Sequence, residues 1–313
     1  MSFSGNVKDE LSRQCSSARH CQIAEISAII SMCGRILISE TNKYTVKIHT
    51  ENIAVARKYF TLLKKTFNID TENSVRQSSK LRMYTVSINH HDDAIKVLQA
   101  SKLLSEDGDI YENLSLSDNL IIQRECCKRA FIRGAFLASG SISDPEKFYH
   151  FEIVCAAQNK ALQLQCIILN FNIDAKIVER KKHFVVYIKE GAGIVDILNV
   201  MEAHVALMNL ENVRILKEMR NSVNRKVNCE TANLNKTVSA AVKQIEDIKF
   251  IRDTVGLSML SENLEEIARL RLDNPDSSLK ELGEMLNPTV GKSGVNHRLR
   301  KIAKIAEELR GGK

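Results

Sequence analysis

The sequence has no tryptophan and little proline or glycine. Its 313 residues include 3 Pro and 13 Gly, which excludes a collagen-like chain and a Pro-rich disordered one. No run approaches the roughly 18 uncharged apolar residues of a membrane-spanning helix. The N-terminal stretch MSFSGNVKDELSRQ is polar and charged, unlike a signal peptide. These absences predict a cytoplasmic protein.

Common motifs for metal, thiol and nucleotide chemistry are also absent. The 8 cysteines form no C-x-x-C pair, so neither a zinc ribbon nor a thioredoxin-like site is predicted. Cys155 and Cys166 stand in apolar runs, which is typical of buried thiols in a reducing compartment. Adjacent Cys126 and Cys127 have no histidine nearby in the sequence, which favours a structural role over a reactive thiol. No glycine-rich phosphate loop occurs, so no cofactor and no metal are expected.

The histidines do not indicate a metal site either. Adjacent His90 and His91 in NHHDDA point to different sides in a strand or a turn, so they rarely chelate one ion. Asp92 or Asp93 is expected to cap the helix that follows them. His297 has no ligand partner at i±4, so a contact with a base or a phosphate suits it better.

The chain does have ample apolar content and an excess of positive charge. Hydrophobic residues make up 44% of it, enough for real cores, and its length predicts two or three domains. The net charge is +7 and the pI is about 8.9. This balance favours acidic partners, above all nucleic acid.

An internal repeat occupies the first two hundred residues. The stretch ISAIISMCGRI (26–36) aligns with IRGAFLASGSI (132–142), and FNID occurs verbatim at 67–70 and 171–174. The matched segments lie about 105 residues apart, and the small drift in that spacing is what short loop deletions would produce.

Each repeat predicts the same order of elements. A helix ending in small residues precedes a strand pair, then come a helix with apolar residues at helical spacing, a second strand pair and a closing helix. The second helices are IAVARKYFTLLKKTF and KALQLQCIILNF. The predicted fold class is α+β, with a duplicated α-β-β-α-β-β-α domain whose copies bury their uncovered faces against each other.

This duplicated unit, with RGAFLASGSI opening its second copy, resembles the LAGLIDADG homing-endonuclease fold. In that family the two motif helices pack closely, and each ends with a metal-binding acid before its last glycine. The matching positions here are Cys33 and Ser139, which offer no hard anionic oxygen for Mg²⁺. The resemblance therefore implies that cleavage by that mechanism is absent. The small residues that permit close packing are Gly134, Ala135, Ala138 and Gly140.

From about Glu211 the chain becomes polar, basic and rich in asparagine, which predicts a long helix passing into a connecting segment. The amphipathic helix VSAAVKQIEDIKFI follows. DSSLKELGEMLNPT then opens with a capping box from Ser278 to Glu281, and Gly283 leaves room for a crossing helix. With SGVNHRLRKIAKIAEELR, these features predict an all-α helix-turn-helix domain.

The outward face of the last helix carries residue types that suit phosphates and base edges. From Lys292 to the end there are seven Lys or Arg against two Glu. The alternative is a helical hairpin with a solvated basic face. The predicted DNA contacts are Ser278, Lys280, Lys292, Ser293, Asn296, His297, Arg298, Arg300 and Lys301.

A degenerate LAGLIDADG-like duplication joined to a helix-turn-helix resembles the WhiA family of bacterial DNA-binding proteins. The similarity includes MSFSGNVKDEL, RGAFLASGSISDP, NRKVNCETANLNKT and KSGVNHRLRKI. It implies a transcriptional regulator or chromosome-associated factor in cell division, chromosome segregation and, in sporulating lineages, sporulation. The implied partner is double-stranded DNA on the nucleoid, with room for a regulatory protein and no small-molecule substrate.

We expect four segments. Residues 1–125 form the first repeat with an N-terminal helix, and 126–222 form the second. Residues 223–257 form a helical connector, and 258–313 form the helix-turn-helix domain.

The duplicated domain is expected to act as a binding or docking platform, for DNA or for a protein. Two other functions remain open: an endonuclease that uses a different acid, such as Asp144 or Glu152, and a protein-interaction adaptor without DNA contact. The cations that could follow phosphates along a saddle are Lys47, Arg76, Lys80, Arg82, Lys176, Arg180, Lys181 and Lys182.

Overall fold

The computed structural model describes residues 2–77, 82–105, 110 and 120–311. It contains two compact units, residues 1–217 and 218–313. Within the described ranges, no helix is both long and apolar enough to cross a membrane.

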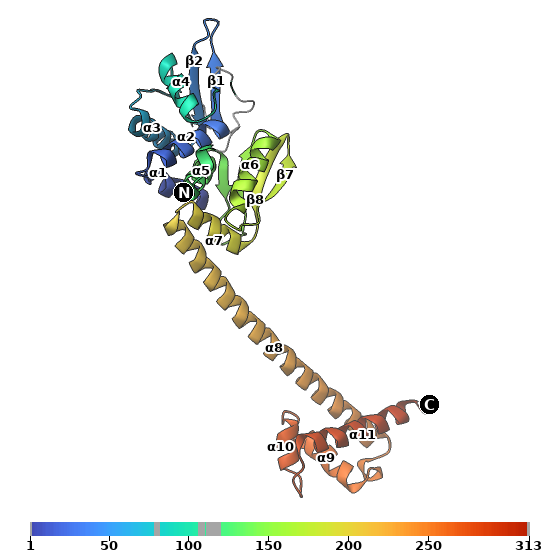
Figure 1. The fold of residues 1–313 in the computed structure, drawn as a ribbon. Coiled ribbons are helices and arrows are strands. Elements are labelled where there is room, and N and C mark those ends of the chain that lie inside the picture. The colour runs from blue at the N-terminus through green and yellow to red at the C-terminus, as the bar shows by residue number, and fades with distance from the viewer. Residues whose placement is uncertain (1, 78–81, 106–109, 111–119, 312–313) are drawn as a thin grey trace. The chain divides into compact units, whose positions relative to one another are not determined.

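The first unit holds two copies of one fold, preceded by helix α1 (Phe3–Arg13) (Figure 1). The first copy consists of α2 (Arg19–Cys33), β1 (Gly34–Ile38), β2 (Tyr44–Thr50), α3 (Ile53–Phe67), β3 (Glu72–Gln77), β4 (Arg82–Ile88) and α4 (His91–Ala100). The second consists of α5 (Glu125–Ser139), β5 (Gly140–Ile142), β6 (Phe151–Cys155), α6 (Gln158–Leu169), β7 (Lys176–Arg180), β8 (His183–Ile188) and α7 (Gly191–Val200).

The two copies share one sheet topology. The antiparallel strand orders are β1-β2-β4-β3 and β5-β6-β8-β7. The short helix η2 (Leu120–Ile122) precedes the second copy. The duplicated α-β-β-α-β-β-α fold predicted from the repeat is confirmed.

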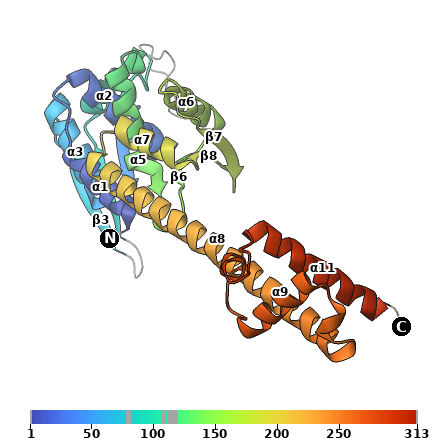
Figure 2. The same ribbon diagram turned by 90° about the horizontal axis from the view of Figure 1, so that it is seen from below.

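Helices α2 and α5 pack against each other along the seam between the copies (Figures 1 and 2). Helix α2 is buried along nearly its whole length, as expected of a helix with little amphipathic character. Gly134 permits the close approach, because a Cβ there would lie 2.6 Å from the carbonyl oxygen of Glu25 and 2.9 Å from the Cβ of Ala28. The seam therefore depends on the absence of a side chain at this position.

The verbatim repeat FNID has a local physical cause. Asn68 ends α3 in the left-handed conformation with φ of 55°, and Asn172 adopts φ of 58° after α6. Asparagine tolerates this conformation better than most residues. The following Ile69 and Ile173 are each 2% exposed, so the motif turns the chain back to the core after the helix in both copies.

Helix α4 begins differently from the prediction. Its N-cap is His90, and no side chain caps it. Asp92 and Asp93 lie in the first turn, where their charge favours the positive helix end. The expectation that one of them is the capping residue is wrong. The ring of His91 stacks on the ring of Tyr44, and its Nδ1 accepts a hydrogen bond from the backbone N–H of Tyr44 at 3.0 Å. This nitrogen of His91 is therefore engaged with Tyr44 and does not form a site with His90.

Helix α8 (His204–Thr254) is one uninterrupted helix of 51 residues, where we expected a helix, a connecting segment and another helix. It begins in the first unit and ends in the second. The second unit continues with η3 (Leu257–Met259), α9 (Glu262–Asp273), α10 (Leu279–Glu284) and α11 (Lys292–Gly311). Its core contains Ile248, Ile267, Leu282, Val295 and Leu299.

Candidate nucleic-acid interface

The ends of α2 and α5 place Cys33 and Ser139 where the resemblance puts metal-binding acids. The Cys33 thiol donates to the carbonyl oxygen of Ile29 at 3.3 Å, and the Ser139 hydroxyl donates to that of Ala135 at 3.5 Å. Burial raises the pKa of Cys33 to about 12 despite the opposing effect of Lys8. Neither side chain offers a carboxylate, and both are engaged with their own helix.

A lysine from α1 adds positive charge at this place. The ammonium of Lys8 lies 5.7 Å from the centre of the Phe136 ring, one turn before the end of α5. Burial lowers the pKa of Lys8 to about 8, and interaction with Cys33 opposes that shift. Its charge acts on the same thiol that occupies the first motif position. A cation here disfavours a divalent metal ion nearby.

The acids of the alternative nuclease function have local roles. Asp144 accepts the backbone N–H of Glu146 at 3.0 Å in the turn after β5. Glu152 on β6 lies 3.1 Å from His150 Nε2 and accepts from the Ser141 hydroxyl at 3.1 Å. Glu152 points away from the core, because its neighbours Phe151 and Ile153 are fully buried.

The first sheet presents a cluster of cations on its outer face. Arg35 pairs with Lys47 across β1 and β2. The pKa of His49 is lowered by its burial and then by the charges of Arg35, Lys47 and Arg76. Arg35 was not among the predicted cations. Its position in the strand that follows the first motif helix could have indicated it. Arg82 has the same parity as the buried residues Val86 and Ile88 of β4, so it belongs to the opposite side of the sheet from this cluster.

The second sheet is more mixed. Lys176 and Arg180 stand at exposed positions of β7, and Lys181 and Lys182 form the following hairpin turn with positive φ. Glu152 and exposed Val178 interrupt the positive charge on the outward side. Lys80 lies outside the described residues.

The helix-turn-helix has the predicted local anchors. The Ser278 hydroxyl accepts from the Glu281 N–H at 3.3 Å, and the Glu281 carboxylate accepts from the Ser278 N–H at 2.7 Å, so the capping box is confirmed. The contact with the Ser278 N–H is the main cause of the lowered pKa of Glu281. A Cβ on Gly283 would meet the carbonyl oxygen of Val290 at 2.0 Å and the Cγ2 of Val295 at 3.1 Å. The glycine therefore admits both the turn and α11.

A mainly exposed stripe of basic and polar residues runs along α11, outside its buried face of Val295, Leu299, Ile302 and Ala306. Spacings of three and four residues place its members on one side of the helix. Lys304, which the sequence interpretation omitted, extends it. We define the α11 stripe as Lys292, Ser293, Asn296, His297, Arg300, Lys301 and Lys304.

Three predicted contact residues lie elsewhere. Arg298 is on the flank of α11, and its guanidinium donates to the carbonyl oxygen of Asn263 at 3.5 Å. Ser278 uses its hydroxyl in the capping box. Exposed Lys280 is 3.7 Å from the carboxylate of Glu284 on α10. The structure thus gathers six of the nine residues on one stripe.

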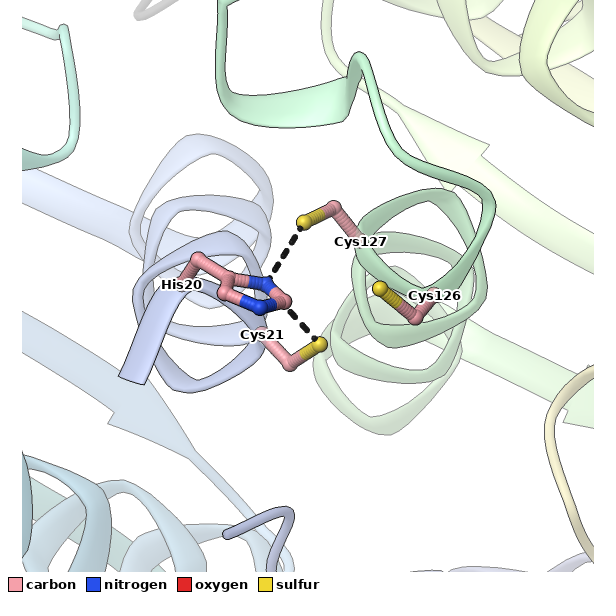
Figure 3. A group of neighbouring side chains, drawn as sticks. All are labelled: His20, Cys21, Cys126 and Cys127. Carbon is pink, nitrogen blue, oxygen red and sulfur yellow. Dashed lines mark hydrogen bonds between the residues drawn. The ribbon is translucent and has the colours of Figure 1, made fainter. Parts of the chain in front are cut away.

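The fold gives Cys127 a histidine neighbour that is distant in the sequence. His20 Nδ1 lies 3.2 Å from Cys127 Sγ and 3.3 Å from Cys21 Sγ (Figure 3). Burial and the neighbouring thiols raise the pKa of Cys127 to about 12. These residues come from the first turns of two helices that only the fold brings together.

Three family models match successive parts of the chain. They are the WhiA N-terminal LAGLIDADG-like domain over residues 19–104, the WhiA LAGLIDADG-like domain over 128–220 and the WhiA C-terminal HTH domain over 223–306. The chain belongs to the WhiA family. The models agree with the two repeats and the helix-turn-helix of the structure.

Curated WhiA relatives match over their whole length. The protein named "Probable cell division protein WhiA" in Lachnoclostridium phytofermentans is 56% identical over 312 residues, covering 99% of this chain and 100% of its own. Its namesake in Alkaliphilus oremlandii is 50% identical over 317 residues, covering 100% and 99%. The crystal structure of full-length WhiA from Thermatoga maritima has a TM-score of 0.61 at 25% identity, covering 98% and 99%.

Proposed function

We propose that this chain is a cell division protein that binds double-stranded DNA through the α11 stripe and does not cleave it. The observation that carries the proposal is the exposed basic stripe on the last helix of a helix-turn-helix. Lysine and arginine there suit phosphates, whereas Asn296 and His297 can hydrogen-bond base edges. Such a helix docks in a major groove with its N-terminal residues toward the bases.

The physiological role follows from the relatives. Their printed name, "Probable cell division protein WhiA", supports a role in cell division. We further propose that the chain is a transcriptional regulator or chromosome-associated factor in the cytoplasm, located on the nucleoid. Chromosome segregation and, in sporulating lineages, sporulation are the processes proposed beside division. A regulatory protein is the further partner, for which the outer faces of the two sheets are available.

Arg300→Ala and Lys301→Ala are each expected to weaken binding to a mixed-sequence duplex by about tenfold, the equivalent of one charge-assisted hydrogen bond. Each should also lower the slope of log affinity against log salt by about 1, because one phosphate contact is lost. Fluorescence anisotropy with the full chain at several salt concentrations measures both quantities.

Lys249→Ala is the matched control, since it removes one exposed positive charge from α8 in the same unit. Its affinity and slope should stay near those of the unsubstituted chain. If all three variants bind alike, the α11 stripe is not the DNA contact. If the unsubstituted chain binds no duplex, the adaptor function replaces this proposal.

Loss of nuclease activity is the second part of the proposal. Hydrolysis of a phosphodiester by a Mg²⁺ site needs hard oxygen ligands. Neither Cys33 nor Ser139 supplies an anionic oxygen, and Lys8 adds positive charge beside Cys33. We expect supercoiled plasmid to stay intact with the full chain and Mg²⁺ or Mn²⁺, as measured by gel electrophoresis. Nicking that disappears in Asp144→Asn or Glu152→Gln would support the alternative endonuclease instead.

A further inference from the structure

Four metal-ligating side chains converge at the first turns of α2 and α5. His20 and Cys21 come from α2, and Cys126 and Cys127 come from α5 (Figure 3). Their ligand atoms all lie within 4.8 Å of one another. The group stands at the opposite end of the two helices from Cys33 and Ser139, so it is separate from the degenerate nuclease positions.

The convergence follows from the duplication. Cys21 precedes Gly34 by the same interval that separates Cys127 from Gly140, so these cysteines are equivalent in the two repeats. His20 is equivalent to Cys126 in the same way. Packing of α2 on α5 brings the two dipeptides face to face, although they stand about 105 residues apart in the chain.

The chemistry of the four donors selects the metal. Three thiolates and one imidazole form a ligand set of structural zinc sites, which are tetrahedral and closed. Two sulfurs bound to one zinc ion at about 2.3 Å lie about 3.8 Å apart. The observed spread of at most 4.8 Å needs only a small contraction to reach that geometry. Carboxylates, which Mg²⁺ or Ca²⁺ would require, are absent from the group.

The surroundings fit a thiolate-bound cation. Zinc with three thiolates carries one net negative charge, and the N-terminal ends of α2 and α5 both favour negative charge. Arg124 adds a positive group, because its Nη1 lies 3.3 Å from His20 Nε2. When zinc binds Nδ1 of His20, the proton of the ring is on Nε2. Nε2 can then no longer accept a hydrogen bond from Arg124, so the Arg124 side chain must move away from it. Cys21 and Cys127 are buried and Cys126 is exposed, which leaves a path for the ion to enter.

We propose that His20, Cys21, Cys126 and Cys127 bind one zinc ion that cross-links the two repeats. The three thiols release their protons to water as the sulfurs bind the metal. The ion then ties α2 to α5 at the end of the seam where neither helix has a side-chain cap. The duplicated domain is thereby held as one platform, and its stability depends on zinc.

The test uses the full chain purified under reducing conditions without chelator. We expect about one zinc per chain by mass spectrometry of the metal, as a single four-ligand site requires. Co²⁺ added to the metal-free chain should give the absorption of a tetrahedral thiolate site. Chelator should lower the melting temperature, and added Zn²⁺ should restore it.

Variants separate binding from folding. Cys126→Ser changes an exposed ligand and should lose most of the bound zinc while the far-ultraviolet circular dichroism stays unchanged. Cys166→Ser and Cys229→Ser, two exposed cysteines elsewhere, should keep the full zinc content. Full zinc content in both Cys126→Ser and Cys127→Ser would overturn the proposal. So would a Cys21–Cys127 disulfide in the reduced preparation, or Co²⁺ binding without thiolate absorption.

Discussion

Glu25→Gln is expected to lower the free energy of unfolding by about 3–5 kcal/mol, because it leaves a buried positive charge without its counter-charge. Glu25 is fully buried in α2. Its Oε1 lies 3.1 Å from Lys58 Nζ on α3 and 3.4 Å from Arg133 Nε on α5. One carboxylate therefore joins three helices around the seam. Urea unfolding followed by circular dichroism measures the change.

Arg133 and Lys58 differ in the polar partners that they keep after Glu25→Gln. Arg133 keeps Glu202, whose carboxylate lies 2.6 Å from Arg133 Nη1. Among the described residues, Lys58 keeps the carbonyl oxygens of Leu11 and Gln14, and its side chain is 1% exposed. The penalty should therefore fall mainly on Lys58. Lys58→Met in the Glu25→Gln background is expected to recover stability, because it replaces the stranded charge with an apolar side chain.

Glu202→Gln is the matched control, since it removes the other carboxylate that contacts Arg133. Its side chain is 48% exposed against 0% for Glu25, so water already screens that pair. A loss of about 0–1 kcal/mol is expected. Equal losses in Glu25→Gln and Glu202→Gln would show that burial does not determine the energy of these pairs.

Periodic features made the duplicated fold predictable from the sequence. FNID recurs because Asn68 and Asn172 meet the same conformational demand after equivalent helices. The helix-turn-helix was equally predictable. Ser278 and Glu281 form a capping box between residues three apart in the sequence, and Gly283 is required by Val290 and Val295, which lie within twelve residues of it.

The unbroken α8 shows where composition misled. Asparagine-rich segments favour turns, and that preference suggested a connecting segment within the helix. No glycine or proline occurs between His204 and Thr254, and these are the stronger helix breakers. The helix ends at Thr254, two residues before the next glycine, Gly256, which adopts φ of 83°. Stop signals were better evidence than polarity.

The candidate sites were only partly predictable, because contact depends on geometry that residue type does not carry. Arg298 has the right chemistry for DNA, but it stands beside Leu299 on the flank of α11, and the helical period places it toward α9. Local C-x-x-C spacing does not reveal the proposed zinc ligands, because Cys21 and Cys127 are brought together by the packing of two repeats. The alignment of those repeats did contain the signal, since it places the two cysteines at equivalent positions.

Gly134→Leu is the second change with a large expected effect, a loss of several kcal/mol in the free energy of unfolding. The Cβ alone would lie 2.6 Å from the Glu25 carbonyl oxygen and 2.9 Å from the Ala28 Cβ. Both neighbours belong to α2, so relief requires the two helices to move apart. Overpacking of this kind costs about 1–3 kcal/mol even for small additions, and leucine adds three more carbon atoms.

Gly134→Ala tests the same point with the smallest side chain. Alanine favours a helix over glycine by about 1 kcal/mol, so a net loss of about 1–2 kcal/mol would mean that the clash outweighs this gain. Gly191→Ala in α7 is the control, because its Cβ would meet its nearest neighbours at an ordinary 3.6 Å. That variant should be neutral or slightly more stable. If Gly134→Ala is as stable as Gly191→Ala in urea, the seam has slack, and the close approach of α2 and α5 does not depend on the missing side chain.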